Sequence, residues 1–141
     1  MPAALTPAIN TSPVIKDRPI SPEKLNSTVL DWTRIAATPT KVGELRQFFD
    51  SGTRTLDRLE CHVSTINPAE ASHPAHRHPD EELIIIKDGT LEVTINGTAS
   101  RAGPGSLFFF ASNDLHGMRN PGTTPATYYV IRIFPRDLVP A

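Results

Sequence analysis

Short apolar runs separated by turn residues are the sequence feature that most constrains this fold. The runs are rich in Val, Ile, Thr and Phe, and each is bounded by Gly, Pro, Asn or Asp, which is typical of strands. No run shows a sustained 3.6-residue period, so a sheet of alternating strands and helices is disfavoured. The pattern predicts an all-β antiparallel sandwich or barrel. The expected strands are residues 44–50, 55–66, 82–87, 90–95, 98–101, 106–110, 115–120 and 126–134.

Dipeptides between these runs predict where the chain reverses. Asn96-Gly97 is the strongest hairpin signal, because both residues tolerate the positive φ that a type I′ turn requires. Asp88-Gly89 predicts the turn before it, and the stretch 103–105 predicts the next one. The strands on either side of Asn96-Gly97 should therefore pair as a hairpin.

Length and charge limit the classes of protein to which this chain can belong. At 141 residues it has room for one domain with one core. Its formal net charge is −1, with acidic and basic residues interspersed, so the basic stripe of a nucleic-acid-binding protein is missing. The longest apolar runs fall far short of the roughly 20 residues of a membrane span. We expect neither nucleic acid nor a membrane as a partner.

Cys61 is the only cysteine in the sequence, so no intramolecular disulfide can form. We interpret it as a small buried apolar residue. This cysteine usage favours a cytoplasmic location, although a secreted or periplasmic chain trimmed of its leader would look the same.

The first 26 residues differ in composition from the rest. Five prolines stand there among small polar residues, a composition that buries little surface and favours extended backbone. We interpret residues 1–26 as an extended Pro-rich arm or linker and residues 27–141 as one barrel domain. Trp32 is the large apolar residue expected to anchor the start of that domain.

A group of histidines and one glutamate indicates chemistry. His76 and His78 are two residues apart, which on a strand directs both imidazoles to one face. On the same continuous strand Glu82 would lie about 13 Å beyond His78, too far to bind the same ion. The chain must therefore turn between them, and Pro79-Asp80 supplies the turn signal.

His116 joins this group from a later predicted strand. Three neutral imidazoles and a carboxylate suit Mn, Fe, Co, Ni, Cu or Zn, and they are too rich in nitrogen for Ca or Mg. We predict one divalent transition metal, of unknown identity, with four protein ligands. These ligands are His76, His78, Glu82 and His116.

The spacing of these residues follows two motifs. The first consists of the pair His76 and His78, three residues, Glu82, six residues and Gly89. The second begins at Gly105 and passes through residues 111–113 to His116 and Asn120. With these motifs the chain resembles the cupin superfamily, and specifically its single-domain, cupin 2 type members. The resemblance covers roughly residues 55–134.

Three positions depart from the cupin motifs. Ala111 stands in place of the usual proline, Asn113 in place of the turn glycine, and Glu70 where the first motif usually opens with glycine. Asn tolerates left-handed backbone almost as a glycine does, so we expect the second motif to keep its loop. The resemblance implies an antiparallel jelly-roll β-barrel that binds a small molecule. It also implies a homodimer, for which Val29, Leu30 and Trp32 offer apolar surface.

Several other polar residues are candidates that we place outside the metal site. Glu81 competes with Glu82, but it lies on the opposite strand face. We interpret His73 as a loop residue at the surface. His62 alternates with an apparent core-facing set that includes Cys61, so it should face away from the core. Arg132 alternates with isoleucines and is expected to point outward.

The cupin fold does not by itself identify a reaction. Four protein ligands leave two positions free on an octahedral ion, where a bidentate oxygen ligand fits, and this favours an enzyme. The first hypothesis is a metal-dependent oxygenase, isomerase or lyase acting on a small oxygenated molecule, with Fe(II)-type dioxygenation to be tested first. No separate general base is identifiable. The alternative is a non-catalytic, metal-dependent module that binds a sugar or small acid.

Overall fold

The computed structural model of this chain describes residues 22–137. Residues 1–21 and 138–141 lie outside the described part, and with them falls most of the predicted arm, 1–26. The division into an arm and a domain from 27 to 141 therefore stays a prediction.

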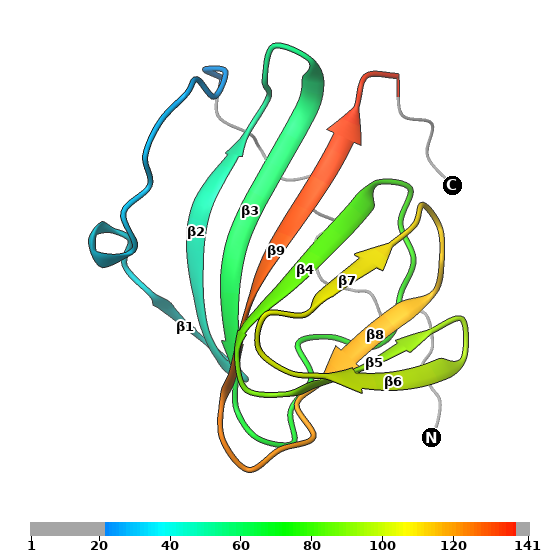
Figure 1. The fold of residues 1–141 in the computed structure, drawn as a ribbon. Helices are drawn as coiled ribbons and strands as arrows, with labels where there is room; N and C mark the ends of the chain where they lie inside the picture. The colour runs from blue at the N-terminus through cyan, green and yellow to red at the C-terminus, as the bar shows by residue number, and fades with distance from the viewer. Residues whose placement is uncertain (1–21, 138–141) are drawn as a thin grey trace.

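The described residues form an all-β antiparallel jelly roll, as the sequence pattern predicts (Figure 1). Its only helical element in this range is one 3-10 turn, Trp32–Arg34. Each of the predicted strands is present with ends that differ by at most one residue, and a short first strand is additional. The strands are β1 (Thr38–Thr40), β2 (Gly43–Ser51), β3 (Leu56–Ile66), β4 (Glu81–Asp88), β5 (Leu91–Ile95), β6 (Thr98–Ala102), β7 (Leu107–Phe110), β8 (His116–Arg119) and β9 (Ala126–Pro135).

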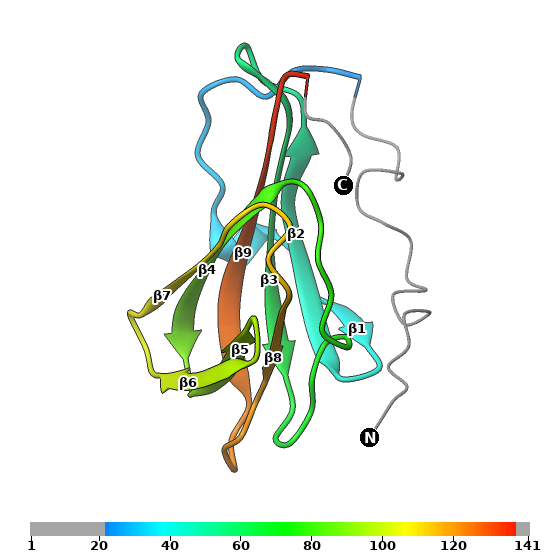
Figure 2. The same ribbon diagram turned by 90° about the vertical axis from the view of Figure 1, so that its right-hand side faces the viewer.

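The strands form two sheets that enclose one core. Six of them lie in the order β1-β2-β3-β9-β4-β7, and the other three lie in the order β6-β5-β8. The view turned by 90° shows the small sheet as a second layer beside the lower part of the large one (Figure 2). Apolar side chains from both sheets fill the space between them, namely Ile66, Ile84, Ile86, Leu91, Val93, Phe108, Phe110, Met118, Ala126, Tyr128 and Val130.

Turn residues adopt the backbone conformations that their positions require. Asn96 has φ 47° and Gly97 has φ 90°, so both residues of the predicted I′ hairpin have positive φ. Asn113, which replaces the usual motif glycine, has φ 64°. Gly89 has φ 83°, and a Cβ at this position would lie 2.8 Å from the Cα of Ala126. A glycine is therefore required at Gly89 for two reasons, conformation and space.

Trp32 packs on the outer face of the large sheet. Its ring centroid lies 6.2 Å from that of Phe48 and 6.4 Å from that of Tyr129, and the guanidinium of Arg46 lies 4.5 Å from the Trp32 ring centre. The segment before β1 is thus anchored to the large sheet by Trp32, as expected from its size. Within residues 22–137 no helix has the length and apolar character of a membrane span.

The strand register corrects two expectations about faces. On β9 the core residues Tyr128 and Val130 are followed on the same face by Arg132, which is buried. His62 lies directly opposite Val130, so it shares that inner face, whereas Cys61 is buried on the other face of β3. Arg132 and His62 therefore point inward, contrary to the sequence-based expectation. The expectation is wrong because β3 has buried apolar residues on both faces, and an apolar residue there does not identify the inner one.

Candidate metal site

The four predicted ligands converge at one end of the core. His76 and His78 come from the loop before β4, Glu82 from β4 and His116 from the first position of β8. Each offers one ligand atom, and the four atoms lie within 4.8 Å of one another. His78, Glu82 and His116 are buried and His76 is partly buried. Residues distant in sequence are thus brought together as the spacing of the two motifs implies.

The two histidines of the first motif do not lie on a regular strand. His76 is joined to His116 by a single antiparallel bridge, in which each backbone N–H donates to the other's carbonyl oxygen at 2.9 Å. The chain bends at Pro79 and Asp80 before β4 begins. The predicted turn between His78 and Glu82 is therefore present, and it allows the carboxylate to meet the imidazoles.

Backbone carbonyl groups orient two of the imidazoles. Nδ1 of His78 lies 2.9 Å from the carbonyl oxygen of Asp80, and Nδ1 of His116 lies 3.0 Å from that of Asp114. A carbonyl accepts hydrogen bonds and cannot donate them, so each Nδ1 carries the proton and donates. The Nε2 atoms are then left to face Glu82, whose Oε1 lies 2.9 Å from Nε2 of His78 and 3.3 Å from Nε2 of His116.

Buried nitrogen atoms without partners indicate that these residues suit a metal ion. Both ring nitrogens of His76 and Nε2 of His116 are buried and make no hydrogen bond. Such groups are destabilising unless something satisfies them. A divalent transition metal at the centre of the cluster accepts their lone pairs, and Glu82 offsets part of its charge. The donor set therefore fits the predicted metal.

The charges around the cluster shift its pKa values in opposite directions. Burial, together with neighbouring histidines, lowers the pKa of His76 to about 2, so this ring is neutral. Burial also disfavours the charged form of His78, but hydrogen bonds to Asp80 and Glu82 outweigh it and raise its pKa to about 9. Burial would raise the pKa of Glu82, yet the imidazoles of His116 and His78 beside its carboxylate hold it well below its usual value. Glu82 is accordingly ionised.

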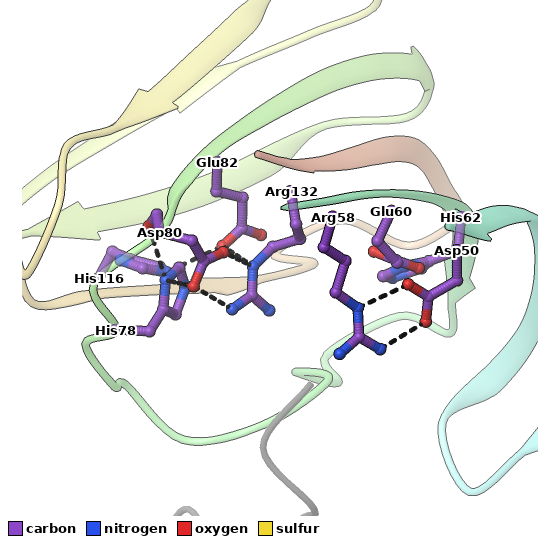
Figure 3. Close-up of polar contacts among 9 residues, drawn as sticks. All are labelled: Asp50, Arg58, Glu60, His62, His78, Asp80, Glu82, His116 and Arg132. Atoms are coloured by element: carbon purple, nitrogen blue, oxygen red, sulfur yellow. Dashed lines mark hydrogen bonds and ion pairs between the residues drawn. The ribbon is translucent and has the colours of Figure 1, made fainter. Parts of the chain in front are cut away.

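Arg132 lies beside this cluster, paired with a second buried carboxylate. Its Nη2 donates to Oδ1 of Asp80 at 2.9 Å and its Nε donates to Oδ2 of the same carboxylate. Its Nε also lies 3.9 Å from Oε1 of Glu82. Figure 3 shows Arg132 between the metal cluster and a second polar group further along the sheet. Sequence reasoning missed both Arg132 and Asp80 as neighbours of the site.

The second polar group lies on β2 and β3 and was also missed. Glu60 is fully buried, and its Oε2 accepts a hydrogen bond from Gln47 at 2.8 Å and lies 2.7 Å from Nδ1 of His62. Glu60 stands directly opposite Arg132, which in turn stands opposite Glu82. The sequence does contain charged residues at alternate positions of β3. They could not be assigned to the interior, however, without knowing which face of the strand points inward.

Two other candidates have different outcomes. Glu81 is exposed, so it lies outside the cluster as expected. The expectation that His73 is a surface residue is wrong, because it is half-buried and its ring packs on that of His76, with the centroids 4.0 Å apart and the planes tilted by 31°. Its Nδ1 lies 2.9 Å from the carbonyl oxygen of Pro74. Burial lowers the pKa of His73, so its ring is neutral beside the site.

Solved structures with similar folds have diverse descriptions. They include the Cupin_2 domain of an XRE family transcriptional regulator from Enterobacter cloacae, at 23% identity and TM-score 0.51, over 55% of this chain and 83% of that one. A predicted oxalate decarboxylase from Thermotoga maritima is similar at 17% identity and TM-score 0.60, over 76% and 99%. The polyketide cyclase RemF from Streptomyces resistomycificus is similar at 16% identity and TM-score 0.61, over 81% and 88%.

These identities are low enough that the likeness shows the fold alone. No curated protein matches the sequence. The family comparison goes further, because residues 62–132, half of the chain, match Cupin_2, the cupin domain. That segment contains all four candidate ligands and both motifs from which the resemblance was argued. The chain belongs to the cupin family.

Proposed function

We propose that this chain is a metal-dependent enzyme acting on a small oxygenated molecule, with Fe(II)-type dioxygenation as the first reaction to test. The observation that carries the proposal is the buried cluster of three imidazoles and one carboxylate with ligand atoms within 4.8 Å of one another. The bound metal would supply Lewis-acid or redox chemistry. Four protein ligands leave two positions of an octahedral ion for substrate oxygen atoms.

The protein's own residues hold this arrangement in place. The carbonyl groups of Asp80 and Asp114 direct the imidazoles of His78 and His116 toward the cluster. The ring of Phe110 stacks on His116 at a centroid distance of 3.9 Å and restricts its rotation. Phe110 is fully buried, so it also excludes water from that side of the cluster.

Charge pairing around the cluster supports recognition through oxygen atoms. Arg132 is the guanidinium that contacts the cluster, and it is engaged by both oxygens of Asp80. Within residues 22–137, the guanidinium that an anionic substrate would meet there is therefore already paired. We therefore expect binding through hydroxyl, carbonyl or carboxyl oxygens directed at the metal position, and no contribution from Arg132 as an anion receptor.

Elemental analysis followed by oxygen uptake tests the proposal. The purified full chain should contain near-stoichiometric transition metal, and after anaerobic loading with Fe(II) it should consume oxygen with a member of a panel of diols, catechols and hydroxy acids. His116→Ala is the matched control and should abolish both metal content and uptake. A chain that binds no transition metal after loading would refute the proposal.

A second candidate function is a non-catalytic module in which the metal organises a pocket for a sugar or small acid. It is supported by the occurrence of a Cupin_2 domain in a transcriptional regulator. Saturable binding of a panel member without its conversion would favour this module. Turnover under the same conditions would favour the enzyme.

A further inference from the structure

We propose that Asp80 and Arg132 are a positioning pair for the metal site. Asp80 fixes the orientation of the His78 imidazole. Arg132 holds the carboxylates of Asp80 and Glu82 in place and keeps both ionised. The inference rests on the metal-binding function proposed above and identifies residues outside the ligand set that govern it. Arg132 lies on the inner face of β9 and Asp80 in the bend just before β4, and both are buried.

Asp80 contacts His78 in two ways. Its backbone carbonyl oxygen lies 2.9 Å from Nδ1 of His78, and Oδ1 of its carboxylate lies 3.2 Å from the same nitrogen. The Nδ1 proton of His78 is therefore shared between two oxygen atoms of one residue. A carboxylate on the far side of a ligating imidazole fixes its tautomer, its ring orientation and its basicity.

Arg132 holds that carboxylate through a two-point contact. Nη2 donates to Oδ1 and Nε donates to Oδ2, and this planar fork fixes the rotation of the Asp80 carboxylate. The register places Arg132 directly opposite Glu82, whose Oε1 is 3.9 Å from Nε of Arg132. The guanidinium of Arg132 therefore lies between two carboxylates (Figure 3). Glu82 is a candidate metal ligand, and Asp80 contacts the candidate ligand His78.

Burial makes the two residues depend on each other. Asp80 is 2% exposed and Arg132 is 9% exposed, so removal of either charge would leave the other buried without its two-point partner. Removal of Asp80 would also free Arg132 to turn toward Glu82 and compete with the metal for its carboxylate. Both effects predict weaker metal binding without any change in the four ligands.

The chain contains a matched pair that serves as an internal control. Arg58 donates to both oxygens of Asp50 at 2.7 Å, again as a two-point contact on the inner side of the sheet. Arg58 and Arg132 each lie 5.7 Å from the ring centre of Phe134, one on β3 and one on β9. Among residues 22–137, the hydrogen bonds and ion pairs of Asp50 and Arg58 include none to a candidate metal ligand. Disrupting this pair therefore measures the effect of losing a buried ion pair that is remote from the metal site.

The experiment measures Co(II) affinity of the full chain by calorimetry for wild type, Asp80→Asn and Asp50→Asn. Asp80→Asn should lower the affinity by roughly 10- to 100-fold, whereas Asp50→Asn should stay within about twofold of wild type. Histidine side-chain ¹⁵N spectra of the metal-free protein give an independent readout when they are recorded above about pH 10, where the ring of His78 is neutral because its pKa is raised to about 9. The wild type should show His78 protonated at Nδ1, and Asp80→Asn should show a mixture of tautomers.

A double variant keeps the test decisive where the single variant fails to fold. Asp80→Asn combined with Arg132→Gln removes both charges, so neither is left buried without its partner; this variant should fold and still bind Co(II) more weakly than wild type. Unchanged affinity in the folded variants, or an equal loss in Asp50→Asn, would overturn the inference. Absence of Co(II) binding by wild type would instead refute the proposed function, and the inference with it.

Discussion

At the residue scale, the four ligands are held by unequal surroundings. Nδ1 of both His78 and His116 is occupied by a carbonyl oxygen, whereas neither nitrogen of His76 has a partner. Glu82 is the only ligand with a negative charge. His76 therefore depends most on the metal for its orientation, and Glu82 contributes most to neutralising it.

Ligand substitutions should separate the site from its neighbours. Replacing His76, His78 or His116 by Ala should reduce metal affinity by more than roughly 100-fold, since a whole donor is lost. Glu82→Gln should also weaken binding, because an amide oxygen binds a divalent ion less well than a carboxylate. Metal content by elemental analysis measures these effects. Glu81→Gln is the control, and this variant should keep its full metal content. Loss of the metal in Glu81→Gln but not in Glu82→Gln would show that Glu81, and not Glu82, faces the site.

Cys61 should be chemically inert while the protein is folded. Burial, and then the negative charge of Glu60, raise the pKa of its thiol to about 12, so little thiolate forms at neutral pH. Because folding raises the pKa of the thiol, the buried neutral thiol contributes fully to stability below about pH 9. This contribution is lost as the pH rises from about 9 toward 12, where the thiol of the unfolded chain ionises first. A chromogenic disulfide reagent at pH 8 should react slowly with the native protein and completely in guanidinium. Rapid reaction of native protein would contradict this assignment.

At the element scale, two glycine turns connect β4 to β5 and β5 to β6. The turn at Gly89 ends β4, and it packs tightly against the start of β9 at Ala126. The turn at Gly97 joins β5 to β6, and nothing lies within 4 Å of where its Cβ would be. Both glycines have positive φ, so they share the conformational requirement and differ only in the space available.

This difference allows strain and steric contact to be measured separately. Gly97→Ala should lower the free energy of unfolding by about 1–2 kcal/mol, which is the usual penalty of left-handed backbone. Gly89→Ala should lower it further, because the new methyl group would meet Pro125 and Ala126 within about 3 Å. Chemical denaturation of both variants provides the comparison. Equal effects at the two positions would show that the contact with β9 relaxes freely.

At the scale of the whole molecule, exposed apolar side chains suggest association. Val29 is 91% exposed, and on β7, an edge strand of the large sheet, Leu107 and Phe109 are 55% and 50% exposed. Trp32, which was also considered for a partner surface, packs instead on Phe48 and Tyr129 of its own chain. Val29, Leu107 and Phe109 are therefore the apolar groups that a second copy would cover.

The homodimer stays a prediction with a direct measurement. Sedimentation equilibrium of the full chain at micromolar concentration should give twice the monomer mass, because apolar residues this exposed gain most from burial against a partner. Phe109→Ser combined with Leu107→Ser should shift the equilibrium toward monomer without emptying the metal site. A purely monomeric wild-type chain would rule the homodimer out.

The sequence by itself determined the local features of this protein. Turn chemistry and strand runs are set by the backbone preferences of neighbouring residues, so the hairpin at Asn96 and Gly97 and the strand ends could be predicted. The spacing of two short motifs likewise identified the four residues that the structure brings together. Tertiary structure alone decided which faces of β3 and β9 are inward. Because β3 has buried residues on both faces, the alternation of apolar and polar residues did not show that Arg132 and His62 point inward. Only the pairing of β9 with β3 and β4 places these two side chains inside.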